Sequence, residues 1–255
     1  MKLSYRLLAF MMALVWSMAA CASLASAAPM PKEKEKEHEG KQVDSGSFGV
    51  FQSGHRVGTE TFSIYQTGSG SVIQSEFKTE NTPPDVQSSE MHLTTAGEIR
   101  RYEWKELSPE KAQSVIVPNE DFLNQKWSTG EEKEHEQPYL LPTSTSILDD
   151  YFFIHRELLI WKFVALTCSK KDNGMVQCPP KQHTQFPTLN PHQHSSAGLS
   201  VESIGREKVS LKSGVQELNK LEIKSESGTW QIWLNDQWMV MKMSVVGENT
   251  EVVRD

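Results

Sequence analysis

Alternating apolar and polar positions dominate the chain from about residue 47 onward, as expected for half-buried β-strands. Gln52–His55 separates two such segments and predicts a hairpin turn, with Gly54 at the position that requires a positive φ. Further segments arrive about every 10–14 residues, each bounded by residues that favour turns. This spacing predicts an antiparallel meander rather than βαβ units. The first expected strands lie at 48–50, 57–65, 72–77, 91–93, 99–104 and 115–117.

One segment in the middle of the chain has a helical pattern instead. Ile147–Phe163 has apolar residues at helical spacing, and most of its other positions are apolar too. Ser144–Ser146 precede it, and Asp149 and Asp150 fall in its first turn, where a helix N-terminus favours such residues. A helix this apolar has to be enclosed, and the concave face of a curved sheet is its expected location.

Alternation returns after a proline-rich passage. Asn235–Gln237 predicts the last hairpin turn of this second β region. The strands expected here lie at 199–204, 209–211, 217–226, 228–234 and 238–246. Sheet, helix and more sheet in one chain predict a single β-rich domain over residues 47–255. The predicted fold class is mainly β (α+β), with a curved antiparallel sheet or incomplete β-barrel enclosing one apolar helix.

The N-terminus has the features of an export signal. Lys2 and Arg6 precede the apolar stretch Leu7–Ala20, and Ala25–Ala27 supplies small residues for cleavage, so residues 1–27 are predicted to be a signal peptide. An uncleaved membrane anchor is the alternative, but the apolar stretch is shorter than the roughly 20 residues that span a bilayer. Met18–Cys21 also resembles a bacterial lipobox. We therefore expect an exported protein, periplasmic or secreted, with a lipoprotein anchored through Cys21 as the alternative.

Residues 28–46 are expected to form a charged flexible linker. Lys32–Glu39 alternates charges without an apolar residue and follows two prolines, so it has no face to bury.

Charge excludes one class of partner. The 255 residues contain 33 Asp and Glu against 26 Lys and Arg, a formal net charge of −7. An acidic chain lacks the basic surface of a nucleic-acid binder, and it has no polybasic stretch for anionic lipids. Membrane contact is therefore expected only through lipidation of Cys21. No cofactor is expected, and no feature indicates the oligomeric state.

Two cysteines remain after the signal. Cys168 and Cys178 lie ten positions apart across the turn-forming segment Lys171–Gly174. In an oxidising compartment an even pair at this spacing predicts a disulfide that closes one local loop.

Candidate catalytic and metal-binding residues are few. His183, His192 and His194 lie near Cys178, and His192 with His194 would suit a metal site if both faced one side of a strand. Paired cysteines and the lack of a nearby acidic residue argue against a metal. Asp149, Asp150 and His155 are candidates for acid–base chemistry, but helix capping accounts for the two carboxylates. Because no known nucleophile, metalloprotease or phosphate-binding motif occurs, we expect no metal site, no catalytic residue and no enzymatic activity.

Several segments resemble a group of uncharacterised exported bacterial proteins. Gly54–Phe62 is similar to their G-x-x-V-G-T-E hairpin, and Asp149–Tyr151, Pro187–Pro191 and Trp233–Asp236 resemble further segments of that group. Their architecture resembles the LolA/LolB type, an incomplete β-barrel whose opening is plugged by helix. The resemblance covers residues 45–255, and it implies a cavity that can hold an apolar molecule. It implies no catalytic residue.

The sequence thus leaves three functions open. The first is binding of an apolar ligand such as a lipid in a half-barrel cavity, the second an envelope scaffold or interaction module with a filled core, and the third an unrecognised hydrolase. Alternation at 239, 241 and 243 predicts three methionines on one side of a strand. Such methionines either line an adaptable apolar pocket or pack as ordinary core residues. Leu158 and Trp161 are expected to meet Trp104, Met241 or Trp230. The candidate cavity residues are Trp104, Phe152, Leu158, Trp161, Trp230, Met239, Met241 and Met243.

Overall fold

A computed structural model describes residues 40–255, apart from 131 and 173. The predicted signal peptide, Cys21 and residues 28–39 of the predicted linker lie outside the described residues. The expected linker boundary is too late, because residues 41–46 belong to the first strand, β1 (Lys41–Gln52). Pairing with the next strand and an ion pair between Asp44 and Arg254 order this segment.

The described residues form mainly β-strands and one α-helix, α1 (Ile154–Thr167). The strands before the helix are β1, β2 (His55–Thr67), β3 (Gly70–Thr79), β4 (Val86–Thr94), β5 (Ile99–Ser108), β6 (Gln113–Asn119), β7 (Phe122–Ser128), β8 (His135–Tyr139) and β9 (Ser146–Ile147). Those after it are β10 (Ser169–Lys170), β11 (Val176–Gln177), β12 (His183–Asn190), β13 (Ser195–Leu211), β14 (Gly214–Ser225), β15 (Gly228–Leu234), β16 (Val240–Val245) and β17 (Thr250–Arg254).

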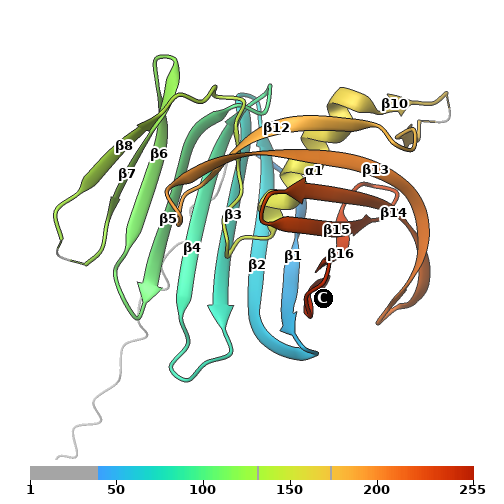
Figure 1. Ribbon diagram of the computed structural model, residues 1–255, viewed down its shortest axis with the longest axis horizontal. Helices are drawn as coiled ribbons and strands as arrows, with labels where there is room; N and C mark the ends of the chain where they lie inside the picture. Colours follow the sequence, from blue (N-terminus) through green and yellow to red (C-terminus); the bar gives the residue numbers. More distant parts are fainter. Residues whose placement is uncertain (1–39, 131, 173) are drawn as a thin grey trace, which may run out of the picture. The chain divides into compact units, whose positions relative to one another are not determined.

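Fifteen of the described strands belong to one sheet, in the order β8-β7-β6-β5-β4-β3-β2-β1-β17-β16-β15-β14-β13-β12-β9 (Figure 1). The first half is an antiparallel meander from β1 to β8, as the sequence predicts. The second half runs from β12 to β17, and β17 returns to pair antiparallel with β1. At one edge β9 pairs parallel with β12, and β10 pairs with β11 in a separate hairpin.

Backbone geometry at the turns agrees with the sequence pattern. In the β1–β2 turn, Ser53 and Gly54 have φ values of 51° and 79°, the positive pair that a two-residue hairpin favours. Gly70 begins β3 with φ 151°, and a Cβ there would lie 1.8 Å from the carbonyl oxygen of Leu93. Only glycine therefore permits this approach of β3 to β4.

The predicted strands differ from the observed ones in two places. β7, β8 and β17 are short, and their alternation is too weak to detect. In the second half, 199–204 and 209–211 belong to one strand, β13, which continues past Gly205 through a change of register. A bulge of this kind keeps the ladder but shifts the face on which side chains lie, so the pattern looks broken.

The helix begins seven residues later than predicted, at Ile154 rather than Ile147. Ser146 and Ile147 pair with β12 instead, and Asp149 accepts a hydrogen bond from the amide of Tyr151 in the turn that follows. The helix is also less apolar than expected. Its buried residues include three that are ionisable, namely His155, Arg156 and Glu157.

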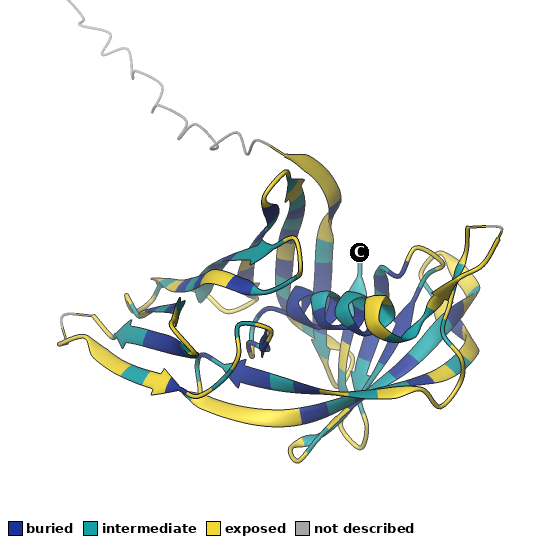
Figure 2. Ribbon diagram, turned by 90° about the horizontal axis from the view of Figure 1, so that it is seen from above, coloured by how far each residue is buried: buried dark blue, intermediate teal, exposed yellow. Residues whose placement is uncertain are grey.

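Helix and sheet share one apolar core. Ile160 and Phe163 of α1 belong to the same buried cluster as Phe48 of β1, Tyr102 of β5 and Ile232 of β15. Figure 2 shows α1 beside strands on which buried residues gather. The predicted class, mainly β with one helix, is confirmed.

Of the helices in the described part of the chain, none combines the length and apolar character required to cross a membrane.

Candidate functional site

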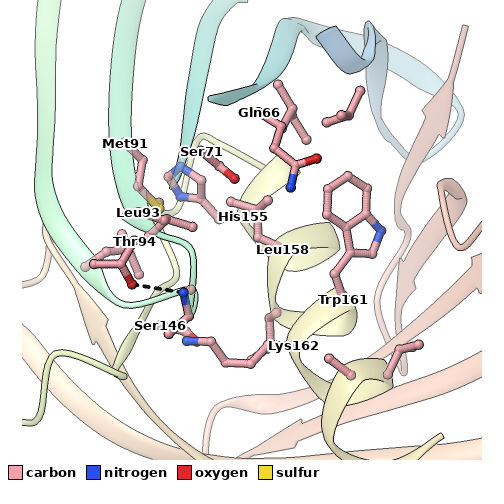
Figure 3. Close-up of a pocket in the computed structure, with 18 of the residues that line it drawn as sticks. Gln66, Ser71, Met91, Leu93, Thr94, Ser146, His155, Leu158, Trp161 and Lys162 are labelled. Carbon is pink, nitrogen blue, oxygen red and sulfur yellow. Dashed lines mark hydrogen bonds between the residues drawn. The ribbon is translucent and has the colours of Figure 1, made fainter. Parts of the chain in front are cut away.

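A pocket of about 780 Å³ lies between α1 and the nearby ends of strands β2 to β5. Ser71 of β3 and Leu93 of β4 contribute from the sheet (Figure 3). Ile64 of β2 also lines the pocket. Side chains alternate between the two faces along each strand, and the register of the paired strands places these three residues on one face. The helix covers that face.

The helix supplies the opposite wall. Leu158, Trp161 and Ala165 follow at spacings of three and four, which places them on one helical face toward the pocket. Trp161 is fixed in orientation because its indole Nε1 donates a hydrogen bond to the carbonyl oxygen of Trp238 at 2.7 Å. The turn between β15 and β16 therefore closes the pocket at this side.

One charged side chain lines the pocket. Lys162 extends from α1 toward Ser146 (Figure 3), and its ammonium donates hydrogen bonds to the carbonyl oxygen of Ser144 at 2.9 Å and to Ser146 Oγ at 3.3 Å. Burial lowers the pKa of Lys162, although the Glu98 carboxylate acts in the opposite direction.

Three of the eight predicted cavity residues line this pocket, namely Leu158, Trp161 and Met239. Phe152 and Met243 are fully buried in the core. Trp104 and Trp230 have other partners. Trp104 stacks on His192, and the ring of Trp230 lies 4.3 Å from the Arg156 guanidinium carbon. The three predicted partners of Leu158 and Trp161 do not line the pocket; they are Trp104, Met241 and Trp230.

The three methionines do not share one side, contrary to prediction. The register between β15 and β16 shifts so that Trp233 pairs with Lys242 and Leu234 with Val240, which leaves Met241 in a bulge. Met241 consequently packs with Val209 in a smaller separate cluster, whereas Met243 belongs to the main core.

Glu60 is a candidate functional residue that was not predicted from the sequence. This fully buried carboxylate of β2 accepts hydrogen bonds from the amides of Phe153 (2.7 Å) and Ile154 (3.3 Å) and from Ser75 Oγ (2.7 Å). Burial raises the pKa of Glu60 to about 8, although these hydrogen bonds favour the ionised form. The detectable signal is an acidic residue at an inward position of the alternation that continues through Phe62 and Ile64.

Asp149 does not cap the helix, contrary to the interpretation of the sequence. It is fully buried before α1, where it accepts a hydrogen bond from the Tyr102 hydroxyl at 2.6 Å and lies 3.0 Å from His192 Nδ1. Burial opposes its ionisation, but the His192 and His155 imidazoles and the Tyr102 hydroxyl together hold the pKa of Asp149 below its ordinary value. Asp150 accepts a hydrogen bond from Asn190 at 2.8 Å and does not join this group.

A third buried carboxylate, Glu157 of α1, faces the other half of the sheet. Glu157 Oε2 accepts hydrogen bonds from the amide of Val240 at 2.7 Å and from Arg254 at 3.2 Å. Arg254 also binds Asp44 of β1. Burial raises the pKa of Glu157 well above its ordinary value. These contacts join α1, β1, β16 and β17.

His155 is buried beside the pocket, and neither ring nitrogen has a hydrogen-bond partner among the described residues. Its ring packs against Tyr102 and Phe152. Burial lowers the pKa of His155 to about 4, so the imidazole is neutral at physiological pH. His155 and the Asp149 group therefore act as core residues and do not form an acid–base pair open to solvent.

Two of the three histidines that follow Cys178 in the sequence stack on tryptophans. His192 and His194 lie in the turn after β12, and each ring centroid is 4.0 Å from that of a tryptophan, Trp104 and Trp127 respectively. His183 is exposed on β12. Within residues 40–255 without 131 and 173, no three His, Cys, Asp or Glu side chains lie close enough to hold a metal ion.

Cys168 and Cys178 form the predicted disulfide. It connects the C-terminal end of α1 to the end of the β10–β11 hairpin. A smaller pocket of about 380 Å³ lies between this hairpin and residues of β13 and β14, among them Arg206 and Asn219.

Comparisons with known proteins give a fold but no function. No family matches the sequence, and no curated protein matches it. Among solved structures, the chain is similar to a beta-barrel-like protein of domain of unknown function DUF1849 from Brucella abortus. The TM-score is 0.51 and the identity 10%, over 83% of this chain and 94% of that chain. This similarity supports a β-barrel-like fold. The significance of the Gly54–Phe62 motif and the relation to LolA and LolB stay predictions.

Proposed function

We propose that this protein binds an apolar molecule, such as a lipid, in the pocket between α1 and the sheet, and that it does so without acting on the molecule chemically. The observation that carries this proposal is the pocket itself, about 780 Å³ in volume, whose lining is mostly apolar. Ligand sites for small molecules commonly have volumes of about 300–1,000 Å³ and apolar walls with few polar groups.

The proposed architecture is a curved half-barrel around the helix. Apolar residues of α1 face strands of both halves of the sheet, and a ligand chain in the pocket would extend the same packing. Each methylene group that such a chain buries contributes about 0.8 kcal/mol. A chain of twelve carbons buried in full would therefore gain about 10 kcal/mol, which is comparable with the cost of association of about 4–15 kcal/mol.

The experiment is native mass spectrometry of protein purified under mild conditions, followed by analysis of solvent extracts. Retained lipid supports the proposal. Ser71→Phe, which places a large ring in the pocket, is expected to abolish this retention, whereas Glu76→Phe on the exposed face of β3 leaves it unchanged. An empty protein that also binds neither added dodecanol nor added dodecanoate overturns the proposal and favours the envelope scaffold.

We also propose that the chain is exported, with residues 1–27 removed or Cys21 lipidated. Sequencing or mass analysis of the mature N-terminus tests this. A terminus at Ala28, or a diacylated Cys21, is expected. Material that begins at Met1 rejects both forms of processing.

A further inference from the structure

The pocket has an uneven distribution of charge. Its lining includes one lysine, Lys162, and no aspartate, glutamate or arginine. The only other residue of the lining that could gain a proton, His155, is fully buried and neutral at physiological pH. An apolar pocket with a single cation is complementary to a ligand with a long apolar part and one negative charge.

Lys162 is held at the pocket by neutral groups. Two of its three N–H donors go to Ser144 O and Ser146 Oγ, and none of the described carboxylates lies within 4.0 Å of its ammonium. Glu98 acts on it only from a longer distance. The third donor thus has no protein acceptor among the described residues. An ammonium in this state gains more from an anionic ligand than one already neutralised by a salt bridge.

The position of Lys162 is fixed on both sides. Its stem packs by the turn between β4 and β5, where a Cβ on Gly97 would lie 3.7 Å from the lysine Cε. Its Cα is one turn from that of Leu158 on α1, and Figure 3 shows the two side chains entering the pocket from the same helix. A head group at Lys162 would therefore continue into a chain that lies along Leu158 and Met91.

We infer that the ligand is a single-chain amphiphile with an anionic head group, of the long-chain carboxylate class, whose head group binds Lys162. This inference rests on the proposed binding function and specifies its ligand. The apolar chain supplies most of the affinity, and the ammonium selects the carboxylate over neutral and cationic analogues.

Calorimetric titration with dodecanoate, dodecanol and dodecylammonium tests the inference on the full chain, with the two ionic amphiphiles kept below their micelle-forming concentrations and dodecanol below its solubility limit. Wild-type protein is expected to bind dodecanoate about tenfold more tightly than dodecanol, and dodecylammonium least tightly. Lys162→Met keeps the apolar stem and is expected to weaken dodecanoate binding about tenfold while leaving dodecanol binding unchanged. Lys162→Arg is expected to keep the preference. Lys208→Met, an exposed lysine of β13, serves as the matched control.

The outcomes separate the two proposals. If neither dodecanoate nor dodecanol binds the wild-type protein, the proposed function fails and this inference fails with it. If dodecanol binds as tightly as dodecanoate, or if Lys162→Met weakens both equally, the pocket binds apolar chains but the head-group inference is overturned. Circular dichroism of each variant shows that a lost affinity does not come from unfolding.

Discussion

The carboxylate of Glu60 accepts the backbone amide of Phe153 at 2.7 Å, across 93 positions of sequence. It thereby serves as the acceptor that the first turn of α1 needs, since Phe153 itself contributes no side-chain cap. The macrodipole of the helix also favours a negative charge at this end. One strand residue therefore fixes where the helix begins and how it lies against β2.

Glu60→Gln is expected to change how stability depends on pH. The pKa of Glu60 rises from 4.5 to about 8 on folding, so the folded protein holds a proton that the unfolded chain releases above pH 4.5. The contribution of this group is therefore fully present below about pH 4.5 and declines by about 1.4 kcal/mol per pH unit up to pH 8. Glutamine accepts the same amides without titrating. Urea unfolding at pH 5, 6.5 and 8 should show that the variant loses less stability with rising pH, and parallel curves would contradict this.

His155→Leu is expected to act in the opposite direction. The pKa of His155 falls from 6.5 to about 4 on folding, so the unfolded chain binds a proton between these values and the folded chain does not. The stability that this group confers is complete above pH 6.5 and is lost as pH falls toward 4. The variant should resist acid more than wild type between pH 6.5 and 4, as followed by urea midpoints. An unchanged acid profile would show that the imidazole is not buried in solution.

The two titrations oppose each other between about pH 4.5 and 6.5. The contribution of Glu60 to the free energy of unfolding declines as pH rises through this window, whereas that of His155 declines as pH falls. The contributions of these two groups to the free energy of unfolding are therefore expected to nearly cancel there. Each single variant should change the pH slope of stability in the direction opposite to the other, and the double variant should have about the slope of the wild type.

Leu158 and Leu159 are expected to differ sharply as alanine variants. Leu159 is buried in the core, and Leu159→Ala should lower the free energy of unfolding by about 2–5 kcal/mol. Leu158 is partly exposed and faces the pocket, so Leu158→Ala should cost less than about 2 kcal/mol and enlarge the pocket. Urea unfolding of both variants measures the difference. Equal losses would mean that Leu158 packs as tightly as Leu159 and that the pocket is closed.

Removing the disulfide is expected to weaken the protein without unfolding it. A bridge across ten positions contributes about 2–3 kcal/mol by constraining the unfolded chain. Cys168→Ser combined with Cys178→Ser should lower the free energy of unfolding by that amount, and reduced wild-type protein should match it. Mass mapping of the oxidised protein that finds two free thiols would contradict the pairing.

Local features of the fold could be predicted from the sequence. The β1–β2 turn depends on Ser53 and Gly54, and the disulfide on two cysteines that flank one short loop. In both cases the determining residues are close together, so the pattern carries the information.

The start of the helix and most of the pocket could not be predicted in this way. Ile147 has the apolar character of a helix residue, but its backbone pairs with β12, and Glu60 supplies the helix cap from a distant strand. The bulge at Met241 likewise depends on how β16 pairs with β15. Contacts between segments far apart in sequence decide these features, and such contacts leave no periodic signal.

Because β1 pairs with β17, the sheet can be completed only late in the synthesis of the chain. Thr250 Oγ1 donates to Gln52 Oε1 at 2.8 Å across 198 positions, and among the described strands the ladder between β1 and β17 joins the two halves of the sheet. While the ribosome is still making residues 53–249, β1 has no partner on one side, and β16 stays unpaired on its own outer side until residues 250–254 emerge. Unpaired strand edges readily join strands of other molecules, and pairing over such a separation is slow. A nascent chain of this protein therefore remains exposed to aggregation until its final strand has been made.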